Sequence, residues 1–173
     1  MLHKSQQSRA FTLVEILVVV VILGIASAVI LPQLGNRDDL RAAAAARMVM
    51  ADLIYAQNLA ISNQSPRYII FTGTGYSIHE SVSGDAITHP IEKTPFVVTF
   101  GSGKLKEMSI TPPDFGGSSI MGFDELGSPF SYNASASPPA SALTTRGEIV
   151  VFSGNYALEI HLEPFTGETS VQR

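Results

Sequence analysis

Glu15 is the residue whose position in this sequence most strongly calls for a chemical explanation. It lies near the start of an apolar run, residues 11–31 (FTLVEILVVVVILGIASAVIL). As a helix this run spans about 31 Å, roughly the hydrocarbon core of a bilayer. A carboxylate within such a segment costs about 2–3 kcal/mol even on lenient insertion scales, so acids there normally serve a function. The alternative is that the Glu15 side chain only reaches toward the lipid headgroups.

The other residue types that carry chemistry form no recognisable pattern. The chain has no Cys, which excludes disulfides, thiol nucleophiles and Cys-based zinc sites. Its four His show no metal-ligand spacing, and no Ser/His/Asp set can be argued from spacing. Asp114, Asp124 and Glu125 are loop carboxylates that could bind Ca²⁺, although they fit no EF-hand pattern. Spacing identifies no catalytic residue, cofactor or metal; we expect a protein that is not an enzyme, and a Ca²⁺ site stays open.

Composition narrows the class of protein further. The 173 residues are enough for one modest domain, and 15% charged residues with 45% hydrophobic residues exclude a disordered charged chain. The net charge is −4, so a broad nucleic-acid-binding face is not expected.

The flanks of the apolar run predict its orientation. Residues 1–10 contain Lys4 and Arg9 and no acid, which places the N-terminus in the cytoplasm and the rest of the chain outside. A plain membrane anchor explains this pattern. A secretory signal peptide cut after Ala28 also explains it, because residues 26–28 read Ala-Ser-Ala. Against the signal peptide, the apolar run continues past that site and contains Glu15.

A third interpretation of the N-terminal segment accounts for its basic start and for Glu15 together. Residues 9–15 (RAFTLVE) resemble the processing site of type IV prepilins and type II secretion pseudopilins. The resemblance implies that prepilin peptidase removes residues 1–10 by cutting between Ala10 and Phe11, and that Phe11 becomes N-methylated. Glu15 is then the fifth mature residue, as in that family. The family usually has Gly where this chain has Ala10.

We expect residues 11–35 to form a transmembrane helix. The same residues can also pack against parallel helices of neighbouring subunits during assembly. The Glu15 carboxylate of one subunit can pair with the Phe11 amine of a neighbour, and a wrong axial step leaves both charges unpaired. Gly24 and Ala28 form a small-xxx-small pair that allows close helix approach, unless they are chance members of an apolar run. Pro32 is expected to kink the helix near the membrane exit.

The rest of the chain predicts an α+β domain. Residues 36–64 have helical periodicity and form the expected periplasmic half of the helix, with one apolar stripe for packing on a sheet. That stripe comprises Ala46, Val49, Met50, Leu53, Ile54, Ala60 and Ile61. Residues 65–173 read as a globular β-rich domain with an antiparallel sheet. This order of elements agrees with the pilin fold, a long N-terminal helix packed on an antiparallel β-sheet.

Turn residues predict three hairpins in that domain. They join residues 68–71 with 76–80, 96–100 with 105–110, and 148–152 with 157–162. Further strands are expected at 120–123 and 169–172. The Ser/Ala/Pro-rich residues 131–146 are expected to form a surface loop.

Residues 53–64 and 68–71 resemble the H-type minor pseudopilin of type II secretion and related minor pilins, with Ala60, Ile61 and Asn63 matching and Gln57 and Leu59 departing. The resemblance implies a minor subunit of a periplasmic pseudopilus, anchored by a single pass in the bacterial inner membrane with its globular domain in the periplasm. It implies other pilin or pseudopilin subunits, the prepilin peptidase and methylase, the inner-membrane assembly platform and membrane lipid as partners.

Three alternatives stay open. The first is a minor type IV pilin in pilus biogenesis or DNA uptake. The mature chain would have a net charge of 9 − 15 = −6 and no basic cluster, so nucleic acid is not an expected partner. The second is a periplasmic binding protein or enzyme exported by a signal peptide. The third is an anchored sensor or adaptor that keeps its leader.

Overall fold

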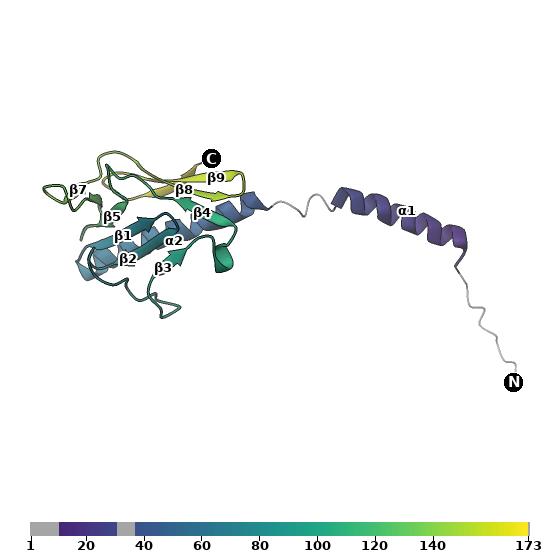
Figure 1. The fold of residues 1–173 in the computed structure, drawn as a ribbon, viewed down its shortest axis with the longest axis horizontal. Coiled ribbons are helices and arrows are strands. Elements are labelled where there is room, and N and C mark those ends of the chain that lie inside the picture. The colour runs from purple at the N-terminus through teal and green to yellow at the C-terminus, as the bar shows by residue number, and fades with distance from the viewer. Residues whose placement is uncertain (1–10, 31–36, 173) are drawn as a thin grey trace, which may run out of the picture. The chain divides into compact units, whose positions relative to one another are not determined.

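The computed structural model describes residues 11–30 and 37–172 and divides the chain into two compact units (Figure 1). The first comprises residues 1–37 and the second residues 38–173, here called the β-rich unit. Ala10 and Pro32, predicted as the cleavage and kink residues, lie outside the described residues.

The first unit contains one helix, α1 (Leu13–Ile30). Its sequence is rich in Leu, Val and Ile, with Glu15 in the first turn. Within the described ranges, none of the helices reaches the combination of length and apolar character that crossing a membrane requires.

The second helix, α2 (Asp38–Asn63), begins with two acidic residues, which the positive end of the helix dipole stabilises. Five consecutive alanines, which have high helix propensity, follow in its first half. Its buried positions recur at spacings of three and four: Ala42, Ala45, Ala46, Val49, Leu53, Ala56 and Ala60. The predicted stripe was wrong at Ile54 and Ile61, which are 44% and 42% exposed. The buried face is rotated away from Ile54 and Ile61 toward Ala42, Ala45 and Ala56, and its alanines leave little side-chain bulk between helix and sheet.

The ten strands of the β-rich unit form two antiparallel sheets. The six-stranded sheet has the order β3 (Val97–Thr99), β2 (Gly75–His79), β1 (Arg67–Thr72), β5 (Ile120–Phe123), β6 (Pro129–Tyr132) and β7 (Ala140–Ala142). The four-stranded sheet has the order β10 (Thr169–Gln172), β9 (Tyr156–Leu162), β8 (Gly147–Ser153) and β4 (Met108–Thr111). The predicted α+β class is confirmed, but the one expected sheet is two.

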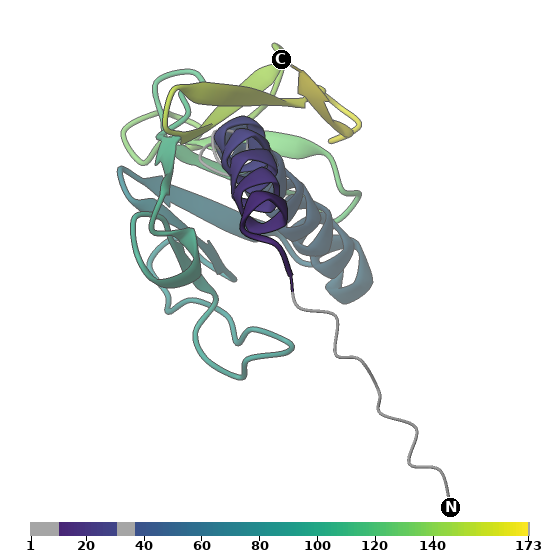
Figure 2. The ribbon, with the colours of Figure 1, turned by 90° about the vertical axis from the view of Figure 1, so that its right-hand side faces the viewer.

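Helix α2 packs against both sheets, and its contacts include β1 and β5 of one and β8 and β9 of the other (Figure 2). A single cluster of buried residues therefore joins the helix to both sheets. Large members of this core are Ile69, Met121, Phe123, Ile149 and Ile160.

Two of the three predicted hairpins are confirmed, β1 with β2 and β8 with β9. The hairpin predicted over residues 96–110 is wrong, because β3 pairs with β2 and β4 pairs with β8. Between them Gly101 and Gly103 adopt φ of 77° and 53°, and the short 3₁₀ helix η2 (Gly103–Leu105) follows. These left-handed residues, which glycine tolerates, turn the chain from one sheet to the other.

The loop predicted at residues 131–146 is partly wrong. Strand β6 extends to Tyr132, and β7 pairs with it, with Ser131 opposite Ser141. Ser and Ala have little strand preference of their own, so the pairing with β6 holds β7 in place. Tyr68 of β1 packs edge-on against Phe130 and Tyr132 of β6, with ring centroids 5.5 and 5.7 Å apart, so the rings meet across the intervening strand β5.

Candidate functional site

A capping interaction fixes the start of α1 directly after Phe11. Thr12 Oγ1 accepts a hydrogen bond from Glu15 N at 3.2 Å, and the Thr12 carbonyl accepts one from Ile16 N at 3.2 Å. Thr12 is therefore the N-cap residue of α1. Thr12 was not among the predicted site residues, although its spacing from Glu15 (T-x-x-E) is a capping-box signature.

This cap brings Phe11 and Glu15 to the same end of α1. Glu15 lies in the first turn, where a carboxylate is favoured by the helix dipole. Within the described part of the chain it makes no ion pair with a cationic side chain. Phe11 is 75% exposed. The predicted pair of residues is thus displayed together at one helix end, with both side chains available to a second molecule.

The large apolar side chains described on α1, from Leu13 to Ile25, are exposed, by 47% at Val18 to 80% at Leu13. A Cβ built on Gly24 would meet nothing within 4 Å, and Ala28, one turn later, is exposed. Ser27 Oγ donates to the Leu23 carbonyl at 2.7 Å, which satisfies its hydroxyl inside the helix. The helix therefore has an uncovered apolar surface with a small-residue position at Gly24 and Ala28.

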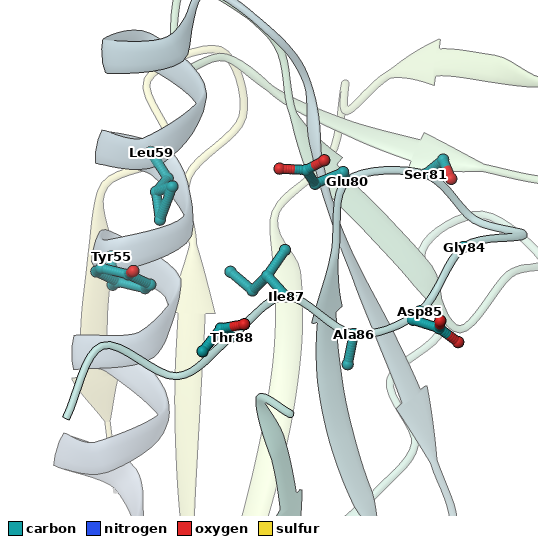
Figure 3. Close-up of a pocket in the computed structure, with 9 residues that line it drawn as sticks. All are labelled: Tyr55, Leu59, Glu80, Ser81, Gly84, Asp85, Ala86, Ile87 and Thr88. Carbon is teal, nitrogen blue, oxygen red and sulfur yellow. The ribbon is translucent and has the colours of Figure 1, made fainter. Parts of the chain in front are cut away.

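A pocket of about 580 Å³ lies beside α2 in the β-rich unit (Figure 3). Tyr55 and Leu59 of α2 face Ile87 across it, and Glu80 and Asp85 stand on the segment that follows β2. Glu80 is already engaged, since its Oε1 lies 3.3 Å from Nη2 of the buried Arg67. Nothing that lines this pocket pairs a nucleophile with a base, so its residues do not supply a catalytic set.

Two of the three carboxylates considered for Ca²⁺, Asp114 and Asp124, accept hydrogen bonds within turns. Asp124 Oδ1 accepts hydrogen bonds from Leu126 N at 2.9 Å and Ser128 N at 2.7 Å. Asp114 Oδ1 accepts from Gly117 N at 2.5 Å. Among residues 11–30 and 37–172, no three His, Cys, Asp or Glu gather in an arrangement that could hold a metal ion.

Asp52 of α2 is half-buried against β2. Its Oδ2 accepts a hydrogen bond of 2.5 Å from the hydroxyl of Tyr76, which is 3% exposed. Burial raises the pKa of Asp52, while the Tyr76 hydrogen bond and His89 partly lower it. Burial and the neighbouring Asp52 also raise the pKa of Tyr76 well above its ordinary value. This pair joins the half-buried Asp52 of α2 to the buried Tyr76 of β2.

Comparison with known proteins adds the following. Residues 5–31 match the family described as the prokaryotic N-terminal methylation motif. No curated protein sequence gives a significant match. Among solved structures, the chain is similar to two crystal forms of the type IV minor pilin FimU of Pseudomonas aeruginosa (strain PAO1). One is 18% identical over 75% of this chain and 91% of that chain, with a TM-score of 0.46. The other is 17% identical over 76% and 88%, with a TM-score of 0.47.

The matched residues include Ala10, Phe11, Glu15 and Gly24, which are among the predicted site residues. The N-terminal segment of this chain thus carries the prokaryotic N-terminal methylation motif.

Proposed function

We propose that this protein is a minor pseudopilin of a type II protein secretion system. In this proposal prepilin peptidase cuts between Ala10 and Phe11, Phe11 is N-methylated, and the mature chain joins a periplasmic pseudopilus. The single observation that carries the proposal is the N-terminal methylation motif, with Phe11 and Glu15 displayed at one end of α1.

The apolar surface of α1 supports the membrane part of the proposal. Exposing the large apolar side chains described on α1 to water is unfavourable, so we propose that lipid or protein covers them. We propose that residues 11–31 anchor the chain in the inner membrane with the N-terminus in the cytoplasm. The β-rich unit then lies in the periplasm. During assembly, neighbouring helices replace the lipid, and Gly24 and Ala28 allow close approach.

Charge pairing supports the assembly step. Cutting before Phe11 would create a cationic amine at the positive end of the α1 dipole, which disfavours it. A carboxylate from Glu15 of a neighbouring subunit compensates that charge in an apolar setting. The structure supports this role because the Glu15 side chain makes no ion pair within the described residues.

The first experiment is the intact mass and N-terminal peptide of the membrane-extracted protein. We expect a chain that starts at Phe11 and carries one added methyl group. A terminus at Val29 contradicts the proposal and identifies an exported protein with a signal peptide. An uncut terminus also contradicts it and leaves an anchored protein.

The second experiment separates charge from helix capping. The cap bond uses the backbone N–H of Glu15, so Glu15→Gln removes the carboxylate charge and keeps the cap. We expect Glu15→Gln to insert and fold but to lose subunit cross-linking and secretion. Glu15→Asp is the matched control that keeps the charge, and it should retain more of both. Lost surface pili with normal secretion would assign the chain to pilus biogenesis instead.

A further inference from the structure

The start of α2 and the short helix η2 lie side by side at one end of the β-rich unit, which we call the near end. Arg41 of α2 joins them, because its Nη1 lies 2.5 Å from the carboxylate of Glu107, just after η2. The hydroxyl of Ser153, the last residue of β8, also reaches this end. It lies 3.0 Å from the Glu107 carbonyl oxygen and 3.3 Å from a carboxylate oxygen of Asp38. The near end is therefore held together by contacts from three elements.

Two lysines of the near end are exposed and unpaired. Lys104 lies on η2 and Lys106 directly follows it, and neither makes an ion pair with an acid among the described residues. Two acids of the same end, Asp38 and Glu107, both pair with Arg41. The two lysines therefore give this surface its positive charge.

A groove of about 260 Å³ lies beside η2. Its lining residues are Arg41, Gly103, Lys104, Lys106, Glu107 and Met108. Because Arg41 and Glu107 neutralise each other, the two lysines set the charge of the groove. Asp39 is two positions from Arg41, about 200° around the helix, and so it points away from the groove. A groove with two lysine ammonium groups suits a phosphate group.

The rest of the β-rich unit is acidic. Residues 38–173 contain eight Lys and Arg and fourteen Asp and Glu, which gives a net charge of −6. Three of these acids, Asp124, Glu125 and Glu168, belong to the β5–β6 and β9–β10 turns, which Gln57 holds beside the second half of α2. An anionic surface therefore attracts the near end and repels the opposite end, which orients the unit.

The place of the near end in the chain points to lipid as the source of the phosphate. In the proposed anchored state α1 lies in the inner membrane, and Asp38 follows Ile30 of α1 by only eight positions. The near end is thus the part of the unit that is joined to the membrane segment. Leu40, in the first turn of α2, is 65% exposed at this end and can enter the apolar edge of a bilayer.

We propose that the near end binds anionic phospholipids of the membrane that holds α1, with Lys104 and Lys106 against the lipid phosphates. The attraction of lysine to an anionic leaflet falls off within a Debye length, about 10 Å at 0.1 M salt, so it acts only when this end faces the lipid. The contact fixes which end of the β-rich unit meets the membrane before the subunit is assembled. The inference rests on the proposed function, which supplies the anchor.

The test uses the purified full-length chain in vesicles of phosphatidylcholine, with or without phosphatidylglycerol. Because the chain has no Cys, one introduced cysteine carries one fluorophore. Ser102→Cys labels the near end, and Leu126→Cys, in the β5–β6 turn, labels the opposite end. Lipids with a spin label on the headgroup quench a fluorophore that lies close to the surface. We expect phosphatidylglycerol to raise the quenching several-fold at position 102 and not at position 126.

Charge variants then test the role of the lysines. We expect Lys104→Gln/Lys106→Gln to lower the ratio of docked to undocked unit by about tenfold or more, because both lysines lose their attraction to the leaflet. Lys104→Arg/Lys106→Arg keeps both charges and should keep the quenching. Arg47→Gln/Lys93→Gln removes the same number of exposed charges elsewhere, so it is the matched control. Circular dichroism of each variant checks that the fold is intact.

Free phosphate separates the two sources of anionic charge. Sodium chloride should reduce the quenching at position 102 in the phosphatidylglycerol vesicles, because it screens the attraction. Inorganic phosphate at the same ionic strength should reduce the quenching no further. A further loss would mean that the groove takes free phosphate, and this would overturn the assignment to lipid.

Two other results would overturn the inference. One is equal quenching at position 102 with and without phosphatidylglycerol, and the other is an equal loss in the lysine pair and in the control pair. Flotation of the chain with the vesicles is measured in the same samples. A chain that floats without the lysine-dependent quenching refutes this inference alone. A chain that does not float refutes the membrane anchoring in the proposed function, and this inference with it.

Discussion

The hydroxyl of Tyr76 donates a 2.5 Å hydrogen bond to the carboxylate of Asp52, across the interface between α2 and the six-stranded sheet. Burial raises the pKa of Asp52 in the folded chain above its ordinary value. The native state therefore binds more protons than the unfolded state between those two pKa values, and stability falls as the pH rises through that window. Above the window the charged carboxylate remains a cost to the fold.

We predict that Asp52→Asn removes this loss of stability. Asn keeps an acceptor for the Tyr76 hydroxyl and does not titrate, so the variant should be at least as stable as the parent at neutral pH. Urea unfolding of the full-length chain in mild detergent, followed by circular dichroism between pH 4 and pH 8, measures the effect. Asp85→Asn, on the exposed loop after β2, is the control and should keep the parental pH profile. A neutral-pH loss of stability specific to Asp52→Asn would contradict this account.

Gln57 holds two turns that are far apart in the sequence. We predict that Gln57→Met, which keeps much of the length and removes the donor, costs about 1–3 kcal/mol of unfolding free energy because two carbonyls lose their partner. Gln57→Glu should cost more, since an ionised carboxylate faces the same two carbonyl oxygens. Asn58→Asp, the exposed neighbouring amide, should change little in the same unfolding experiment. Equal effects at the two positions would show that the bridge does not stabilise the turns.

Gly127 is required for two separate reasons. Its φ is 82°, and a Cβ there would lie 2.7 Å from Cδ1 of Ile61. We predict that Gly127→Ala lowers the unfolding free energy by about 1–3 kcal/mol. Adding Ile61→Ala should recover only part of this loss, because it relieves the contact and leaves the backbone strain. Gly73→Ala, where nothing lies within 4 Å and φ is not positive, should be tolerated. Full recovery in the double variant would mean that backbone strain contributes nothing.

Arg67 is 3% exposed, while the side chain of its partner Glu80 is 72% exposed. Arg67 Nη1 also donates to the Pro66 carbonyl at 2.9 Å, just after α2 ends. We predict that Arg67→Ala costs about 2–4 kcal/mol, because it empties a buried volume and removes donors. Glu80→Gln should cost less than about 1 kcal/mol, since solvent screens its charge. Thermal unfolding of the two variants side by side tests the contrast, and similar losses would contradict it.

Local signals in the sequence were enough to predict α2, the β1–β2 and β8–β9 hairpins and β10. Alanines, first-turn acids and glycine turns act over a few residues, so they can be read without knowing the fold. The pairing of β4 with β8 was missed because Gly101 and Gly103 are typical of a hairpin turn. Whether β4 pairs with β3 or with β8 depends on the position of the second sheet, which the local sequence does not contain.

The residues of the candidate site also divide into those that local sequence predicts and those that depend on contacts distant in the sequence. Phe11, Glu15 and Gly24 lie within one short segment, so their spacing predicts the methylation motif. Thr12 could have been found from its spacing to Glu15. The role of Gln57 could not, because its acceptors at Gly127 and Thr166 are 70 and 109 residues away in the sequence. The exposed state of Ile54 and Ile61 was missed because periodicity gives a stripe but not its exact centre.

Helix α2 is fastened to the β-rich unit by polar contacts at three levels along its length. Ser153 reaches Asp38 near its start, Tyr76 reaches Asp52 in the middle, and Gln57 holds the two turns toward its end. If traction is applied to the chain at Asp38, sliding the helix out of the two sheets must break these contacts together with the alanine-rich packing between them. The load is therefore shared along the helix, and the unit is built to resist extraction rather than to peel from one end.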